Sequence, residues 1–216
     1  MAYSYTGSSR IGNTSCSIAG YPMTLAAWSR PLSGSGTYAI ASTQAVNSSA
    51  HRHVLFYNLN NACVYSVNGS SGTTVSASTG AGSVSTDTWG HFCAVSSSAS
   101  SHIAYYNGVG STASTVNTLS MQTQTSIQAG ARYSGTAYTD VAPSGTFICE
   151  VAVWSVALTA AEVLSLSRGV SAALVRPQSL YLYCPMTRDL SSPFSGKSFS
   201  LTGSPTVAAH PRIYAA

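Results

Sequence analysis

Carboxylates are scarce in this sequence, and their spacing bears directly on whether the chain can be an enzyme. The acidic residues are Asp87, Asp140, Glu150, Glu162 and Asp189. A glycoside hydrolase needs two carboxyl groups that flank the scissile bond. The alternating segment 146–154 contains one acid, Glu150, and Glu162 follows Thr159 at the spacing of a helix-capping pair, which gives it a structural role. We therefore predict that the chain is not an enzyme.

Other catalytic and metal-binding patterns are incomplete. No Gly-x-Ser-x-Gly elbow marks a nucleophilic serine. Residues 108–113 fit a dinucleotide-binding pattern, but Ser-Thr-Val-Asn follows them rather than a helix, so we interpret them as a glycine-rich turn. His51 and His53 would project to the same side of a strand and could share a metal, yet no third ligand is evident. The residues thus predict neither a catalytic group nor a resident metal or cofactor.

Short alternating segments separated by Gly- and Ser-rich joints must position these side chains. Short strands with turn signals between them are typical of an antiparallel β-sandwich. Thr159 and Glu162 form a capping box, and Gly169 can end the helix that it starts, so we expect one short helix near 159–168. The predicted strands cover 24–30, 36–42, 51–58, 62–67, 73–77, 90–96, 102–107, 126–131, 146–154 and 179–184.

Composition excludes several classes of partner. Charged residues make up 6% of the chain, against about 25% in an ordinary soluble domain. The 62 serines and threonines therefore coat the surface with hydroxyl groups in place of charges. The net charge of +4 is spread along the chain without a basic cluster, which argues against a nucleic-acid partner. No apolar run approaches the roughly 18 residues of a membrane span, so no membrane partner is expected.

Residues 1–7 have neither a basic start nor an apolar core, so we expect synthesis in a cytoplasm without a signal peptide. The cysteines are odd in number, widely spaced and mostly within strand patterns. Such cysteines usually behave as small buried hydrophobic residues rather than disulfide partners. They are Cys16, Cys63, Cys93, Cys149 and Cys184.

Several motifs resemble those of the laminin-G-like, concanavalin-A-like jelly-roll family. Residues 145–166 (GTFICEVAVWSVALTAAEVLSL) are similar to the strand, link and capped helix that close that domain. Four further motifs, at 22–31, 87–95, 103–108 and 127–132, follow in the order of the family. The resemblance implies an all-β fold, a two-sheet antiparallel jelly-roll sandwich, in a domain of residues 1–176.

Residues 177–216 change in character and form a predicted C-terminal strand-and-loop extension. Arg-Pro-Gln-Ser-Leu at 176–180 and His-Pro-Arg-Ile at 210–213 resemble sequences that follow laminin-G-like domains in proteins of tailed bacteriophages. We expect the extension to pack on its own domain or on a neighbouring subunit. The resemblance, with the missing active site, predicts a non-catalytic structural protein at the virion surface. It would decorate or reinforce the capsid by binding capsid or other virion proteins, as a homo-oligomer.

A carbohydrate-binding adhesin, on a tail fibre, spike or other surface, is the alternative function, with host glycans as partners. The resemblance implies a lectin site made of aromatic faces and polar donors on loops. Tyrosine suits such a site because it combines an apolar face with a polar tip. The candidate residues are Tyr105, Tyr106, Arg132, Tyr133, Tyr138 and Asp140.

Many laminin-G-like domains bind calcium at the rim of the sandwich, so the resemblance also makes calcium a candidate ligand. Calcium takes six to eight oxygen ligands, with carboxylates among them. The plausible contributors here are Asp87, Asn107 and Asp140, which lie far apart in the sequence. We therefore expect that removing calcium leaves the thermal stability unchanged.

Overall fold

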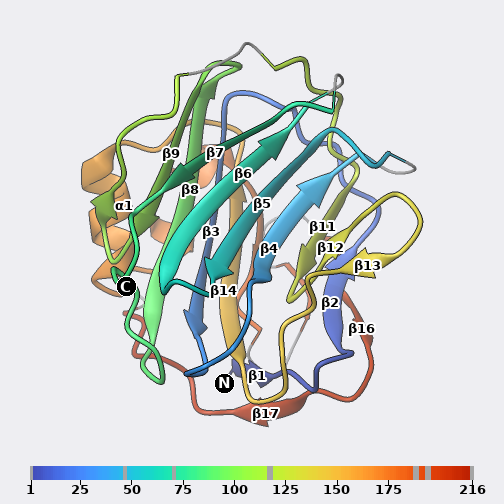
Figure 1. The fold of residues 1–216 in the computed structure, drawn as a ribbon, viewed down its shortest axis with the longest axis vertical. Coiled ribbons are helices and arrows are strands. Elements are labelled where there is room, and N and C mark those ends of the chain that lie inside the picture. The colour runs from blue at the N-terminus through green and yellow to red at the C-terminus, as the bar shows by residue number, and fades with distance from the viewer. Residues whose placement is uncertain are drawn as a thin grey trace.

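The computed structural model describes residues 2–45, 48–69, 72–115, 119–186, 190–192 and 196–214. Its strands form two antiparallel sheets that lie face to face, with one α-helix on the outside (Figure 1). Because side chains alternate along a strand, each sheet presents one apolar face, and stacking buries both. The predicted all-β jelly-roll sandwich is confirmed.

Sheet A contains eight strands, and every pairing in it is antiparallel. β14 pairs with β3 on one side, and with both β1 and β15 on the other. Across the sheet the order is β10 (Val109–Gly110), β9 (Ser101–Tyr106), β8 (Gly90–Ser98), β3 (Met23–Arg30), β14 (Phe147–Trp154), β1 (Ala2–Ser4) and β17 (Thr206–Ala208), with β15 (Leu180–Cys184) beside β14.

Sheet B contains seven strands, and it lies in front of sheet A in Figure 1. Its order is β16 (Ser200–Thr202), β2 (Arg10–Asn13), β11 (Ser126–Ala129), β4 (Tyr38–Gln44), β5 (Arg52–Asn58), β6 (Ala62–Asn68) and β7 (Thr74–Ser78). A separate hairpin, β12 (Arg132–Tyr133) and β13 (Tyr138–Thr139), follows β11. All ten predicted strand segments correspond to strands of the two sheets, whereas β1, β2, β10, β16 and β17 are not predicted.

Alternate side chains of both sheets fill the space between them. Leu25 and Ala27 of β3 point into this core from sheet A, and Leu55 and Tyr57 of β5 meet them from sheet B. All four are completely buried. Burying a side chain such as Leu25 or Leu55 contributes about 1.5–3 kcal/mol relative to leaving it exposed. The apolar face of each strand therefore holds the two sheets together.

A second apolar cluster covers the outer face of sheet A. Helix α1 (Ala160–Ser167) packs Val163 and Leu166 against Trp154 and Tyr183 of the sheet. Two short 3-10 helices, η1 (Ala172–Leu174) and η2 (Pro177–Ser179), continue this layer. None of the helices in the described ranges has the length and hydropathy needed to cross a bilayer. These helices cover sheet A, and the outer face of sheet B carries strands and loops instead (Figure 1).

After Arg176 the chain contributes strands to both sheets. β15 lies beside β14, β16 beside β2 and β17 beside β1. Near the end, the amide of Tyr214 donates to the carbonyl oxygen of Gly169 at 2.6 Å, and the amide of Ser171 donates to that of Tyr214 at 3.2 Å. These contacts lie within one chain. The division into a domain of residues 1–176 and an extension of residues 177–216 stays a prediction.

Candidate functional site

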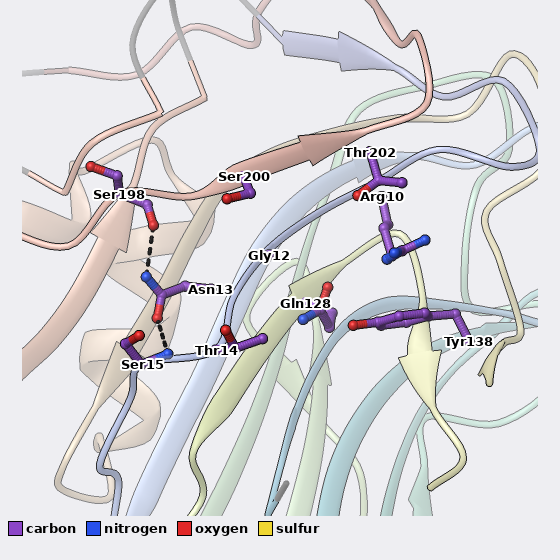
Figure 2. Close-up of a pocket in the computed structure, with 10 residues that line it drawn as sticks. All are labelled: Arg10, Gly12, Asn13, Thr14, Ser15, Gln128, Tyr138, Ser198, Ser200 and Thr202. Atoms are coloured by element: carbon purple, nitrogen blue, oxygen red, sulfur yellow. Dashed lines mark hydrogen bonds between the residues drawn. The ribbon is translucent and has the colours of Figure 1, made fainter. Parts of the chain in front are cut away.

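A pocket of about 320 Å³ opens on the outer face of sheet B (Figure 2). Ile11 and Ile127 point into the core, so their neighbours Gly12 and Gln128 face outward. β2, β11, β16 and the β12–β13 hairpin provide its walls. The lining residues are Arg10, Gly12, Asn13, Thr14, Ser15, Gln128, Tyr138, Ser198, Ser200 and Thr202.

Gly12 and Gln128 form the floor of this pocket. The two residues are direct partners in the pairing of β2 with β11. A Cβ atom at position 12 would overlap the side-chain amide of Gln128, so a larger residue there would displace this amide. Within the described ranges, the Gln128 amide has no hydrogen-bond partner in the protein. It can therefore offer both a donor and an acceptor to a ligand.

Arg10 and Tyr138 form one wall, and Tyr133 packs against Tyr138 from outside the lining. The guanidinium carbon of Arg10 lies 3.6 Å from the centre of the Tyr138 ring. The Tyr133 ring lies 5.1 Å from that of Tyr138, at an interplanar angle of 52°. Figure 2 shows Arg10 between Tyr138 and Thr202, on the same side of the pocket as Gln128. The stack fixes the direction of the guanidinium before any ligand arrives.

The hairpin that carries Tyr138 is held in place by polar contacts. Arg132 and Asp140 form an ion pair across its base, and Thr139 Oγ1 donates to Asp140 Oδ2 at 3.2 Å. The amide of Tyr133 donates to Gln44 Oε1 of β4 at 3.1 Å. A hairpin anchored in this way loses little further conformational freedom when a ligand binds.

The structure brings together four of the six predicted sugar-binding residues and separates the other two. Arg132, Tyr133, Tyr138 and Asp140 belong to the hairpin. Tyr105 and Tyr106 lie in β9 of sheet A and are only 5% and 6% exposed. Tyr105 packs beneath α1, whereas Tyr106 belongs to the core between the sheets. The six residues therefore do not form one site.

Tyr106 does reach a second hollow, of about 380 Å³, at the other end of the sandwich. The turn of Asn107 and the exposed Val109 form one wall of it, and the loop before β8 forms the other. The hydroxyl oxygen of Tyr106 accepts a hydrogen bond from the amide of Ser85 at 3.3 Å. This hydroxyl is therefore engaged with the loop.

Each of the three calcium candidates has a different environment in the structure. The carboxylate of Asp140 is paired with Arg132. Asn107 Oδ1 accepts from the amide of His91 at 2.8 Å, and Asp87 lies in an exposed turn with φ of 58°. No three His, Cys, Asp or Glu side chains of the described ranges gather in a metal-binding arrangement. That removal of calcium leaves the thermal stability unchanged stays a prediction.

The predicted histidine pair diverges in the structure. His51 precedes β5 with φ of 53°, and its Nδ1 accepts from the amide of Gln122 at 3.3 Å. His53 is buried, and its Nδ1 lies 2.5 Å from the hydroxyl of Tyr65. The two imidazoles therefore serve different local contacts.

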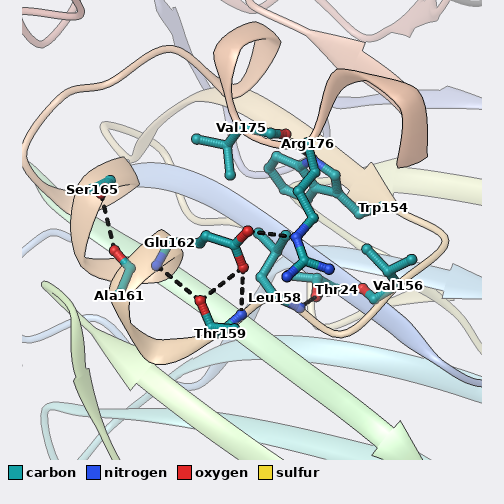
Figure 3. A network of polar contacts seen from close by, with 10 residues as sticks. All are labelled: Thr24, Trp154, Val156, Leu158, Thr159, Ala161, Glu162, Ser165, Val175 and Arg176. Atoms are coloured by element: carbon teal, nitrogen blue, oxygen red, sulfur yellow. Dashed lines mark hydrogen bonds and ion pairs between the residues drawn. The ribbon is translucent and has the colours of Figure 1, made fainter.

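Glu162 has the structural role that its spacing predicts (Figure 3). The amide of Thr159 donates to Glu162 Oε2 at 2.7 Å, and the amide of Glu162 donates to Thr159 Oγ1 at 3.3 Å. Arg176 forms an ion pair with Glu162 Oε1. Burial would raise the pKa of Glu162, but the hydrogen bonds from Thr159 and the pairing with Arg176 outweigh it and lower the pKa. The carboxylate stays charged to stabilise the helix start.

All five cysteines are buried, and none of them forms a disulfide within the described ranges. Burial raises the pKa of Cys16 to about 11, only partly offset by the nearby Lys197. A thiol with such a pKa is protonated at neutral pH and is a poor nucleophile. The predicted role of the cysteines as buried hydrophobic residues is confirmed.

Known structures share this architecture at low sequence identity. A SAP-like pentraxin from Limulus polyphemus is 16% identical with a TM-score of 0.60, over 77% of this chain and 81% of that one. A Bacteroides ovatus protein with a proposed carbohydrate-binding role is 15% identical with a TM-score of 0.67, over 99% of this chain and 61% of its own. The CBM40 domain of a Ruminococcus gnavus IT-sialidase, bound to α2,3-sialyllactose, is 7% identical with a TM-score of 0.59, over 77% and 96%.

No curated protein matches the sequence. The family comparison does find a match, over residues 5–164, to Laminin_G_3, described as the concanavalin A-like lectin/glucanases superfamily. This range contains most strands of both sheets and the start of helix α1. The chain therefore belongs to the Laminin_G_3 family of the concanavalin A-like lectin/glucanases superfamily.

Proposed function

We propose that this domain binds carbohydrate, without catalysis, in the pocket on the outer face of sheet B. The observation that carries the proposal is the prearranged wall of Arg10 and Tyr138 beside the unpaired amide of Gln128. Sugars are recognised by such a combination of directed polar groups in a concave, partly apolar site. Two of the known structures support this choice over a purely structural role, because the CBM40 domain is bound to α2,3-sialyllactose and the Bacteroides ovatus protein has a proposed carbohydrate-binding role.

The absence of catalysis is part of the proposal. Three of the described carboxylates, those of Asp140, Glu150 and Glu162, are already engaged with basic or hydroxyl side chains. A general acid and a general base must face a bound substrate with a pKa tuned for proton transfer. None of the described residues that line the pocket on sheet B carries a carboxylate. A binding role therefore suits it better than hydrolysis.

A glycan array followed by titration calorimetry tests the proposal. We expect wild-type protein to bind a subset of glycans and Tyr138→Ala to weaken that binding about tenfold or more, because the ring supports Arg10. Tyr214→Ala is the matched control, since Tyr214 is exposed and lies at the end of the chain away from the pocket. Absence of binding to any glycan at millimolar concentration would contradict the proposal.

A virion-surface role is the second proposal, with capsid proteins or further copies of this chain as partners. It rests on the charge-poor, hydroxyl-rich composition and on the phage-like sequence at the end of the chain. A decoration protein and an adhesin differ in the number of copies on each particle and in where on the particle they lie. Mass spectrometry and imaging of purified particles would distinguish them: hundreds of copies over the capsid favour decoration, and a few copies at the tail favour adhesion.

A further inference from the structure

Among the described residues that line the sheet-B pocket, Arg10 alone is charged. No Asp or Glu of the described ranges pairs with it, and the acid nearest in the hairpin sequence, Asp140, is paired with Arg132. Arg10 is only partly exposed, so water screens its charge less than that of a free surface arginine. The pocket thus contains a positive charge that has no counter-ion among the described residues.

The stacking of Arg10 determines which of its groups remain available. Tyr138 covers one face of the guanidinium at 3.6 Å. The N–H donors lie in the plane of the guanidinium, and none of them donates to a described residue. In-plane donors match the two oxygens of a carboxylate, whereas the face of the group does not. The free edge of Arg10 is therefore suited to an anion.

The stack of Arg10 on Tyr138 also makes it unfavourable for a neutral sugar ring to stack on Tyr138. Arg10 covers one face of the Tyr138 ring, and Tyr133 packs against the ring as well. A sugar ring that used Tyr138 as a platform would have to displace one of them. Tyr138 consequently serves to support the cation. Recognition then depends on charge and hydrogen bonds more than on aromatic stacking.

The rest of the pocket supplies the hydrogen bonds that a sugar attached to an acidic group requires. Ser200 and Thr202 of β16 stand opposite Gln128 of β11 (Figure 2). Asn13 is already used, because its Nδ2 donates to the carbonyl oxygen of Ser198 at 2.6 Å and its Oδ1 accepts from the amide of Ser15 at 2.8 Å. Asn13 therefore holds the rim of the pocket in place. The side-chain amide of Gln128 and the hydroxyls of Ser200 and Thr202 remain available to ligand hydroxyl groups.

We propose that the pocket selects acidic saccharides, with the guanidinium of Arg10 binding the carboxylate of a sialic or uronic acid and Gln128 binding neighbouring hydroxyls. This inference rests on the proposed carbohydrate-binding function and names the ligand class of that site. A sulfated sugar offers the same negative charge with a different shape. The experiment therefore includes both kinds of anion.

Titration calorimetry would compare 3′-sialyllactose, a uronic-acid disaccharide, lactose and 3′-sulfolactose. We expect the carboxylated sugars to bind at least tenfold more tightly than lactose, as a charge-assisted hydrogen-bond pair provides. That preference should shrink with added salt. A preference for sulfolactose over both carboxylated sugars would overturn the assignment of a carboxylate.

Arg10→Gln should reduce the preference for acidic sugars over lactose to about twofold or less, and Arg10→Lys should keep part of it. Arg168→Gln is the matched control, because Arg168 is exposed at the end of α1 on sheet A. Circular dichroism and melting temperature confirm that each variant folds. If Arg10→Gln proves unfolded, Arg10→Lys and the salt series decide the question.

Three outcomes separate the two proposals. Equal affinity for lactose and sialyllactose would overturn the acidic preference and leave carbohydrate binding intact. An acidic preference that survives Arg10→Gln would show that another group binds the anion, and the role of Arg10 would be wrong. Binding of none of the four sugars, and of no glycan on an array, would overturn the proposed function itself.

Discussion

Nε2 of His210 lies 3.0 Å from Oε1 of Glu150, so a residue of the C-terminal segment meets the middle of sheet A. The other oxygen of Glu150 accepts from the hydroxyl of Tyr183 at 2.5 Å. Glu150 has φ of 55° where the pairing of β14 with β3 shifts, and this bulge redirects its side chain. The two side chains approach closely without an aligned hydrogen bond from His210 Nε2 to the described residues. Glu150 thus joins the end of the chain to the sheet.

His210→Ala should lower the free energy of unfolding by about 1–3 kcal/mol, because it leaves the buried Glu150 carboxylate with one partner fewer. Urea denaturation at pH 6 would measure the change. Glu150→Gln should cost less, since it removes the charge and keeps an acceptor for Tyr183. Arg212→Ala, at an exposed neighbouring position, should stay within about 0.5 kcal/mol of wild type. A wild-type midpoint for His210→Ala would show that the contact contributes nothing.

Stability should fall as the pH decreases from about 6.5 towards 3. Burial lowers the pKa of His53 and of His91 to about 3, whereas each titrates near 6.5 when unfolded. Between these values the unfolded chain binds protons that the folded chain does not. Each such histidine therefore costs about 1.4 kcal/mol of stability per pH unit of acidification.

Melting temperatures at intervals from pH 7.5 to 4.5, at constant ionic strength, would check this slope. His91→Gln should reduce this slope. The buried position beside Trp28 then holds no group that takes up a proton on unfolding. A melting temperature that does not change over this range would contradict the prediction. The Glu162 contacts should be lost only at a lower pH, because the lowered pKa of that carboxyl keeps it charged down to more acidic pH.

Gly12→Ala should weaken glycan binding at least tenfold, since the added methyl group takes the space of the Gln128 side chain. Overpacking at such a site costs about 1–3 kcal/mol of stability, so the variant should still fold. Gly36→Ala is the matched control, because no atom lies within 4 Å of the position of its added Cβ. Affinity for the array-selected glycan would be measured by calorimetry. Unchanged affinity in Gly12→Ala would place the site elsewhere.

Adding EDTA should leave both the melting temperature and glycan affinity unchanged. The carboxylate of Asp140 forms an ion pair with Arg132, and Oδ1 of Asn107 accepts a hydrogen bond from the amide of His91. Neither residue therefore offers calcium a free set of oxygen ligands. Differential scanning calorimetry with and without EDTA checks the first point. A decrease of several degrees that calcium reverses would reveal a cation site.

The inner strands could be predicted because burial makes their sequences apolar and rich in β-branched and aromatic residues. Residues 146–154 are an example, since β14 is buried on both faces, and the capping box of Thr159 and Glu162 marks the helix start as sharply. β16 and β17 could not be predicted in the same way. Their residues are mostly exposed, so no apolar period is required, and their pairing depends on β2 and β1 at the other end of the sequence.

The site could be predicted only where its residues are close in sequence. The hairpin holds Arg132, Tyr133, Tyr138 and Asp140 together, whereas Arg10 joins them through the register that sets Gly12 opposite Gln128. An isolated glycine within a strand can signal such a close approach. Tyr105 and Tyr106 are adjacent in one strand, so they must point to opposite faces and could not share a site.

The register of the first strands has a consequence for synthesis on the ribosome. Tyr3 pairs with Ile148 and with Val207, and Gly12 pairs with Gln128 and with Ser200. β1 and β2 leave the ribosome before these partners and must therefore wait for strands translated much later. Contacts so distant along the chain slow folding and leave the nascent strands open to wrong pairing meanwhile. We infer that β1 and β2 are among the last strands of this domain to reach their native places.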